Sequence, residues 1–129
     1  MPLEIPQSTE LIATKILDAA FQVHRELGPG LLESIYEACL CDELSQTGIK
    51  FERQLALPVQ YKGRSLDAGL RLDLFVAGVV IVEIKAVEKV LPVHKAQLMT
   101  YLKLTNVRLG LLLNFNQALL KDGIHRVAN

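Results

Sequence analysis

The sequence contains no tryptophan, only two cysteines and no excess of either charge, since 14 basic residues balance 14 acidic ones among 129. Charge neutrality argues against a protein that coats nucleic acid or binds membranes through a polybasic patch, although a transient nucleic-acid substrate needs only a local positive rim. No apolar run approaches the roughly 20 residues that a membrane-spanning helix needs. The first residues also lack the basic and then apolar pattern of a secretory signal, so we expect a cytoplasmic protein.

The two cysteines do not predict a disulfide or a metal site. Cys39 and Cys41 lie two apart in a segment with helical periodicity, so their side chains point in different directions and cannot easily pair. No other cysteine or histidine stands at zinc-ligand spacing from them. We expect two reduced thiols in or near the core, as in cytosolic proteins.

Half of the residues are hydrophobic, which suits one compact domain of this length. Residues 1–8 carry two prolines and are expected to form a flexible arm, followed by a single domain over residues 9–129. Apolar periodicity predicts the element order ααβββαββ, an α+β or α/β fold in which helices flank a mixed sheet. The predicted helices cover residues 9–27, 31–46 and 93–105, and the predicted strands cover 50–61, 66–76, 79–85, 108–115 and 124–127.

Individual residues add expectations about burial and strand position. The second helix is expected to bury Leu32 and Ile35 and to expose Glu37. Pro58 predicts that its strand lies at an edge or carries a bulge, because proline cannot donate a ladder hydrogen bond. The apolar run 79–82 predicts a central strand that is covered on both faces.

Three charged residues, Asp73, Glu83 and Lys85, stand in segments that otherwise have the pattern of buried strands. A charge within a sheet is costly unless it is paired or bound to a metal. Glu83 and Lys85 share a face of their strand, and a carboxylate pair formed with Asp73 would need a cation, for which oxygen ligands favour magnesium or manganese. A lysine beside such an ion can position a water or stabilise a phosphate. A salt-bridge cluster on a solvated face explains the spacing equally well.

The third predicted helix carries a polar stripe. Gln97 and Tyr101 are four residues apart and share a helical face, and His94 lies close to the same face. Taken alone, the stripe is as ordinary as any polar helix rim. Its position directly after the acidic strands connects it to the same candidate site.

In this order the motifs resemble a known superfamily. Asp73, the EIK triplet at residues 83–85 and the QxxxY motif at residues 97–101 are similar to the PD-(D/E)XK nuclease superfamily, in particular to its branch with a QxxxY helix. Residues 30–36, GLLESIY, match the GxxExxY signature of a family of small bacterial and archaeal proteins within that superfamily. The resemblance covers residues 9–127.

The resemblance implies a restriction-endonuclease-like core and a nuclease that depends on Mg²⁺ or Mn²⁺. The implied reaction is hydrolysis of phosphodiester bonds in nucleic acid, with DNA favoured over RNA. The implied catalytic residues are Asp73, Glu83, Lys85, Gln97 and Tyr101. The implied metal ligands are Glu33, Asp73, Glu83 and the Ile84 carbonyl.

An alternative reading from a different functional class stays open. Small size and charge neutrality also suit a non-catalytic accessory or binding module that keeps the nuclease-like fold, and a homo-oligomer or a protein partner is compatible with either reading. His24 either reaches the site or serves a structural role. Tyr36 lies on an apolar stripe and is expected to pack rather than to catalyse.

The connection between the two acidic strands decides whether the acids can meet. A two-residue turn at residues 77–78 would pair Asp73 with Val82 and turn Glu83 to the opposite face, because a slip of one residue flips every side chain. A three-residue connection at 77–79 sets Asp73 opposite Glu83. A shared metal therefore requires the longer connection or a bulge.

Turn chemistry favours the longer connection. Gly78 can take the positive φ that a three-residue loop often needs, whereas Ala77 is a poor residue for a type I′ turn. We expect Asp73 opposite Glu83, with carboxyl groups that share a metal lying within about 5 Å of each other. Glu33 is expected to approach them from the second helix.

Overall fold

Two helices form the N-terminal part of the chain. The computed structural model describes residues 4–129, and residues 1–3 of the expected arm lie outside this range. Helix α1 spans Gln7–Leu27 and helix α2 spans Glu33–Gln46. Gly28 follows α1 with a φ of 66°, a conformation that glycine adopts readily. Because α1 begins at Gln7, the last two residues of the expected arm are helical.

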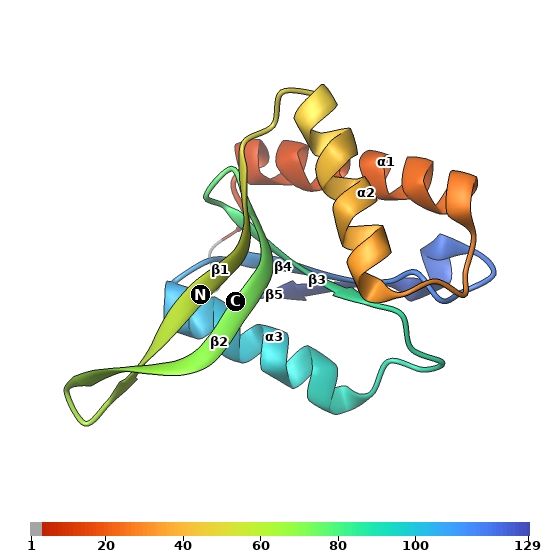
Figure 1. Ribbon diagram of the computed structural model, residues 1–129. Helices are drawn as coiled ribbons and strands as arrows, with labels where there is room; N and C mark the ends of the chain where they lie inside the picture. Colours follow the sequence, from red (N-terminus) through yellow and green to blue (C-terminus); the bar gives the residue numbers. More distant parts are fainter. Residues whose placement is uncertain (1–3) are drawn as a thin grey trace.

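The rest of the chain builds a five-stranded mixed sheet in the order β1-β2-β3-β4-β5 (Figure 1). Neighbouring strands are antiparallel except β3 and β4, which run parallel and are connected through helix α3. The elements are β1 (Phe51–Tyr61), β2 (Arg64–Val76), β3 (Val80–Lys85), α3 (Pro92–Thr105), β4 (Leu109–Asn114), the short 3-10 helix η1 (Leu120–Gly123) and β5 (Ile124–Ala128). The predicted order is confirmed, except that periodicity did not predict η1.

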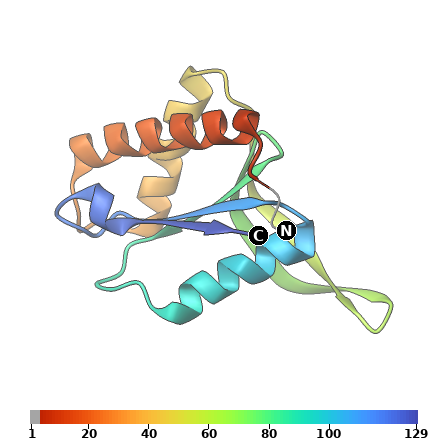
Figure 2. The same ribbon diagram turned by 180° about the vertical axis from the view of Figure 1, so that it is seen from behind.

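Helices cover both faces of the sheet. Helices α1 and α2 lie on one face and α3 lies on the other (Figures 1 and 2). Alternate residues of β3 therefore enter different cores: Val82 packs with Ile16 and Leu40, whereas Ile81 packs with Leu98. This double burial confirms the central strand expected from its apolar run.

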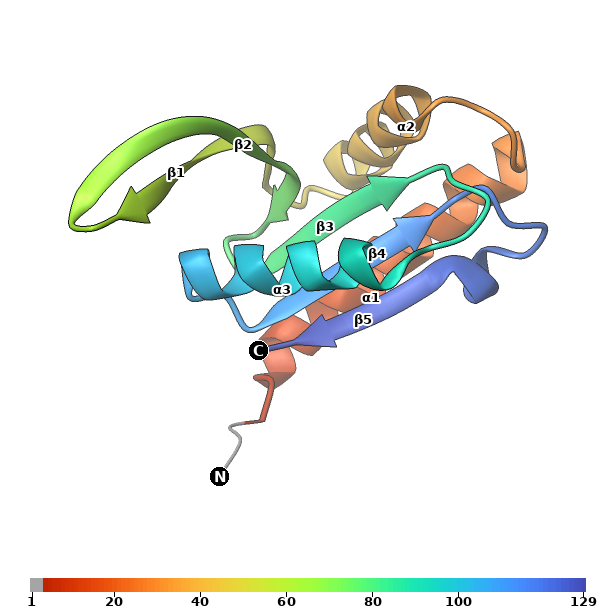
Figure 3. The ribbon, with the colours of Figure 1, turned by 90° about the horizontal axis from the view of Figure 1, so that it is seen from below.

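The strands β1 and β2 form a long hairpin that extends beyond the rest of the sheet (Figures 1 and 3). Strand β1 is an edge strand, and its register with β2 shifts between Leu57 and Val59, so both features expected from Pro58 are present. Strand β2 pairs with β3 only through its last residues, from Leu74 to Val76. The two strands therefore separate next to Asp73.

The expected burial of α2 was partly wrong. Leu32 is 70% exposed and Ile35 is 38% exposed, whereas Glu37 is only 7% exposed. Leu32 precedes the helix, and the face that packs on the sheet is rotated to include Glu37, whose charge is paired with Arg53. The buried residues of α2 are Tyr36, Glu37, Leu40, Cys41 and Leu44.

Two predictions about simple features can be compared directly with the structure. Cys39 and Cys41 are free thiols, as expected from their spacing. Among residues 4–129, no helix combines the length and the apolar character needed to cross a membrane.

Candidate active site

The candidate site lies where β2 separates from β3. The ladder between them pairs Val76 with Val80 and ends with Leu74 opposite Val82. One step further in the same register, Asp73 stands opposite Glu83. Beyond this point the Asp73 side chain takes the place of a backbone partner for β3, because the Ile84 N–H donates a hydrogen bond to Asp73 Oδ2 at 2.8 Å.

The turn that sets this register has three residues between the first paired positions, as predicted. The Val79 N–H donates to the Val76 carbonyl at 3.0 Å. Gly78 takes a φ of 70° as expected, but Ala77 also takes a positive φ, of 52°. The turn therefore places alanine in a conformation that its Cβ disfavours, and it still delivers the register that brings the acids together.

Asp73 and Glu83 contact each other closely. The Asp73 backbone N–H donates to Glu83 Oε1 at 3.4 Å, and the two carboxyl groups are within hydrogen-bonding reach. Glu83 is 8% exposed. Burial first, and then the negative charge of Asp73, raise the pKa of Glu83 to about 9. Two acids in this arrangement share a proton or need a cation.

Lys85 and α3 complete the surroundings of the acid pair. Lys85 follows Glu83 by two residues in β3, and its positive charge acts to lower the pKa of Glu83. From α3, Tyr101 is 6% exposed, and burial, followed by the charges of Glu83 and Asp73, raises its pKa, while a hydrogen bond with the Gln97 side chain acts in the opposite direction. Glu83 therefore lies within electrostatic range of Asp73, Lys85 and Tyr101, and Gln97 contacts Tyr101.

Glu33 is near this place but does not join the pair. Its Oε2 accepts a hydrogen bond from the Ala86 N–H at 3.3 Å, one residue beyond Lys85. Within residues 4–129, no group of three or more His, Cys, Asp or Glu side chains is arranged to hold a metal ion. The expected approach from α2 occurs, but it ends at the backbone after β3, and a ligand role for Glu33 stays a prediction.

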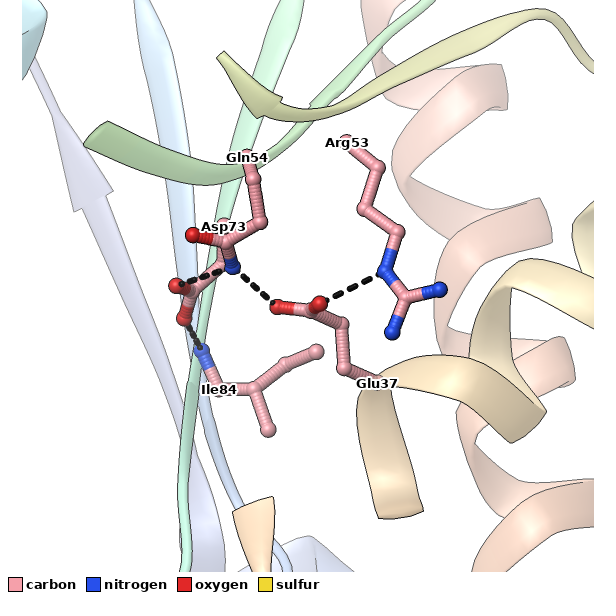
Figure 4. Close-up of polar contacts among 5 residues, drawn as sticks. All are labelled: Glu37, Arg53, Gln54, Asp73 and Ile84. Atoms are coloured by element: carbon pink, nitrogen blue, oxygen red, sulfur yellow. Dashed lines mark hydrogen bonds and ion pairs between the residues drawn. The ribbon is translucent and has the colours of Figure 1, made fainter. Parts of the chain in front are cut away.

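Glu37 and Gln54 belong to the site and were missed. Glu37 was expected to be exposed, but its Oε2 accepts from Arg53 Nε and its Oε1 accepts from Gln54 Nε2, both at 2.7 Å. Gln54 Nε2 also donates to Asp73 Oδ1 at 3.3 Å (Figure 4). The available signal was the position of Glu37 one helical turn after Glu33.

Two other residues of the N-terminal half have structural contacts. The Tyr36 hydroxyl donates to the Gly28 carbonyl at 2.6 Å, and its ring stacks on Phe115, so packing is its role as predicted. His24 Nε2 lies 2.8 Å from the Gln117 carbonyl. This contact places His24 against the loop after β4 and supports its structural reading.

The His94 side chain caps the N-terminus of α3 and does not extend the polar stripe. Its Nδ1 accepts a hydrogen bond from the Leu91 N–H at 3.0 Å. Of the expected stripe, Tyr101 is within range of the charges of Glu83 and Asp73, and Gln97 forms a hydrogen bond with Tyr101.

Surface shape alone does not indicate this site. A hollow of about 980 Å³ lies between α1, the connection from α2 to β1, and the turn from β2 to β3, and Lys15, Phe51 and Phe75 are among its lining residues. None of the acids discussed above lines it. We place the site by its chemistry, because a buried carboxyl group with a raised pKa beside a second acid is the stronger indication of function.

Comparison with known families identifies the superfamily of the chain. The sequence model of the PD-(D/E)XK nuclease superfamily matches residues 10–127. The chain therefore belongs to this superfamily, and its mixed sheet with flanking helices is the restriction-endonuclease-like fold. Searches of curated proteins and of solved structures found no match.

Proposed function

We propose that this protein is a Mg²⁺- or Mn²⁺-dependent nuclease that hydrolyses phosphodiester bonds in nucleic acid, with DNA favoured over RNA. The observation that carries the proposal is the pair formed by the buried Glu83 and the partly exposed Asp73, with Lys85 two residues further along β3. Membership of a nuclease superfamily supports the same reading.

The donor set fits a hard divalent cation. Asp73 and Glu83 offer only oxygen atoms, and the raised pKa of Glu83 reflects a carboxylate whose charge lacks compensation. Magnesium is commonly held by only one or two carboxylates, because it keeps several of its waters. Bound here, magnesium or manganese would neutralise the acids and act as a Lewis acid toward phosphate and water.

The Ile84 backbone supports a further oxygen donor. Its N–H points toward Asp73, on the side of β3 that β2 has left. In a strand the N–H and C=O of one residue point to the same side, so the Ile84 carbonyl faces the acid pair as well. It is the third candidate ligand beside Asp73 and Glu83.

The remaining residues have roles in charge stabilisation and positioning. The Lys85 ammonium can orient the attacking water or stabilise negative charge that develops on the phosphate. Gln97 and Tyr101 hold Lys85 or the nucleic-acid backbone from the α3 side. The site thus combines acids, a cationic side chain and hydrogen-bond donors around one substrate position.

The GxxExxY signature supports a narrower assignment. Gly30 has a φ of 100°, a conformation suited to glycine, Glu33 binds the Ala86 N–H after β3, and Tyr36 ties the connection between α1 and α2. Each residue of the signature therefore has a place in the fold. We assign the chain to the GxxExxY family of small prokaryotic proteins, acting in the cytoplasm.

A cleavage assay tests the proposal. Purified protein is incubated with linear duplex DNA, single-stranded DNA and RNA, with Mg²⁺, with Mn²⁺ or with a chelator. We expect cleavage that requires the metal and is abolished in Asp73→Asn. Absence of cleavage on every substrate, together with indifference to metal, would contradict the nuclease and support the accessory module.

A further inference from the structure

A chain of polar contacts from α2 and β1 reaches the Asp73 carboxylate. It runs from Arg53 through Glu37 and Gln54 to Asp73 (Figure 4). The other oxygen of the Asp73 carboxylate, Oδ2, accepts a hydrogen bond from the Ile84 N–H. Both oxygens of Asp73 are thus engaged, and the plane of its carboxylate is fixed from two directions.

Gln54 reaches this position through an irregular backbone. Its φ of 51° lies in the left-handed region, in the middle of strand β1. The ladder pairs Arg53 with Leu74 and Leu55 with Leu72, but it omits the pair of Gln54 with Asp73 between them. A conformation that costs free energy for a residue with a Cβ is retained where surrounding contacts determine it. Here the contacts are the two carboxylates that the Gln54 amide binds.

Glu37 determines the orientation of that amide. Its buried carboxylate accepts from Arg53 on one oxygen and from Gln54 Nε2 on the other. Only the NH₂ end of a glutamine amide can donate to two carboxylates, so Glu37 and Asp73 together select this orientation. Arg53 compensates the charge of Glu37, as a buried carboxylate requires.

We propose that Gln54 and Glu37 are positioning residues of the metal site: Gln54 orients the Asp73 carboxylate, and Glu37 acts through Gln54. The proposal rests on the proposed function, because it assigns these residues to the support of its metal ligand. Partners that orient metal-binding side chains commonly change metal affinity by 10- to 100-fold when they are removed.

Manganese titration by calorimetry tests this role. Gln54→Gly removes the amide and accepts the left-handed backbone, and Glu37→Gln keeps the size of the side chain but loses the carboxylate. We expect Mn²⁺ affinity to fall about 10- to 100-fold in Gln54→Gly and less in Glu37→Gln. The matched control is Gln60→Gly, at an exposed glutamine farther along β1, which should bind Mn²⁺ like the parent.

The double variant separates positioning from general structural support. If Glu37 acts through Gln54, adding Glu37→Gln to Gln54→Gly causes no further loss of Mn²⁺ affinity, because residues that act as a unit are not additive. Fully additive losses would overturn the claim that Glu37 acts through Gln54. Mn²⁺ affinity within twofold of the parent in both single variants would overturn the proposal as a whole.

A second readout does not depend on metal binding. The Ile84 amide reports on its hydrogen bond to Asp73, so its hydrogen exchange in metal-free protein should accelerate in Gln54→Gly and Glu37→Gln but not in Gln60→Gly. If the parent binds no Mn²⁺, the proposed function fails and this readout alone decides the positioning role. Unchanged exchange at Ile84 in both variants would refute that role. If Gln54→Gly fails to fold, Glu37→Gln carries the test.

Discussion

Glu83 is the residue at which burial and function conflict most directly. Its pKa is raised to about 9, so in metal-free protein the carboxyl group is protonated at neutral pH. In the unfolded chain the group ionises near its ordinary pKa of 4.5. Between these values the folded state holds a proton that the unfolded state has lost, so this group makes stability fall as pH rises from 4.5 toward 9.

The substitution Glu83→Gln removes this pH dependence. We expect the metal-free variant to gain melting temperature relative to the parent as pH rises from 5 to 9, because glutamine is neutral throughout. Each kcal/mol corresponds to roughly 3–5 °C in a domain of this size, so a gain of several degrees is measurable by thermal melts in chelator. If the melting temperatures of variant and parent differ by the same amount at every pH, the raised pKa of Glu83 is contradicted.

Lys85 differs from the acids in what its loss should change. The side chain supplies positive charge and is not a ligand, so Lys85→Ala should lower the cleavage rate by about 10²–10³ while Mn²⁺ affinity stays close to that of the parent. Rate assays and calorimetry on the same protein measure both effects. Lys89→Ala, at an exposed lysine in the following loop, is the matched control. A Lys85→Ala protein that cleaves at the parent rate would remove the lysine from the mechanism.

At the scale of elements, the turn between β2 and β3 carries the register that brings the acids together. It places Ala77 at a φ of 52° and Gly78 at 70°, values that an Asn-Gly pair adopts more readily. Ala77→Asn should therefore stabilise the protein by about 1 kcal/mol, and Ala77→Val should destabilise it, since a β-branched side chain tolerates this region least. Chemical denaturation of both variants measures the difference. Equal stability of the two would contradict the turn geometry.

Elements with a regular pattern could be predicted from sequence, and the irregular ones could not. The apolar run of β3 predicted a central strand, and the proline in β1 predicted an edge strand or a bulge; the structure has these features. The convergence of Asp73 with Glu83 followed from counting residues in one turn. Gln54 was missed because its left-handed backbone breaks the alternation on which strand predictions depend. Glu37 was misjudged because its burial depends on Arg53, a partner 16 residues away in sequence.

At the scale of the whole molecule, the site depends on how the C-terminal part closes on β4. Asn114 at the end of β4 binds both backbone groups of Val87, two residues beyond Lys85. Gly123 packs so closely against Asn114 that an added Cβ would clash with the Asn114 carbonyl oxygen. The segment after β3 is thereby held by Asn114 of β4, and Asn114 is in turn packed against η1.

Gly123→Ala tests this closure. Because the clash is with backbone atoms that cannot rotate away, we expect a loss of about 1–3 kcal/mol in the free energy of unfolding. Thermal or chemical denaturation measures the loss. A variant as stable as the parent would show that η1 can move away from β4 at no cost.

The central claim is that the Asp73 and Glu83 pair is the metal site of a nuclease. An anomalous difference map from a crystal soaked in Mn²⁺ tests it most directly, because manganese scatters anomalously and protein oxygen does not. The account predicts a peak beside the carboxylates of Asp73 and Glu83 and no such peak in Asp73→Ala. Parent crystals that show no anomalous density at these two carboxylates under saturating Mn²⁺ would contradict it.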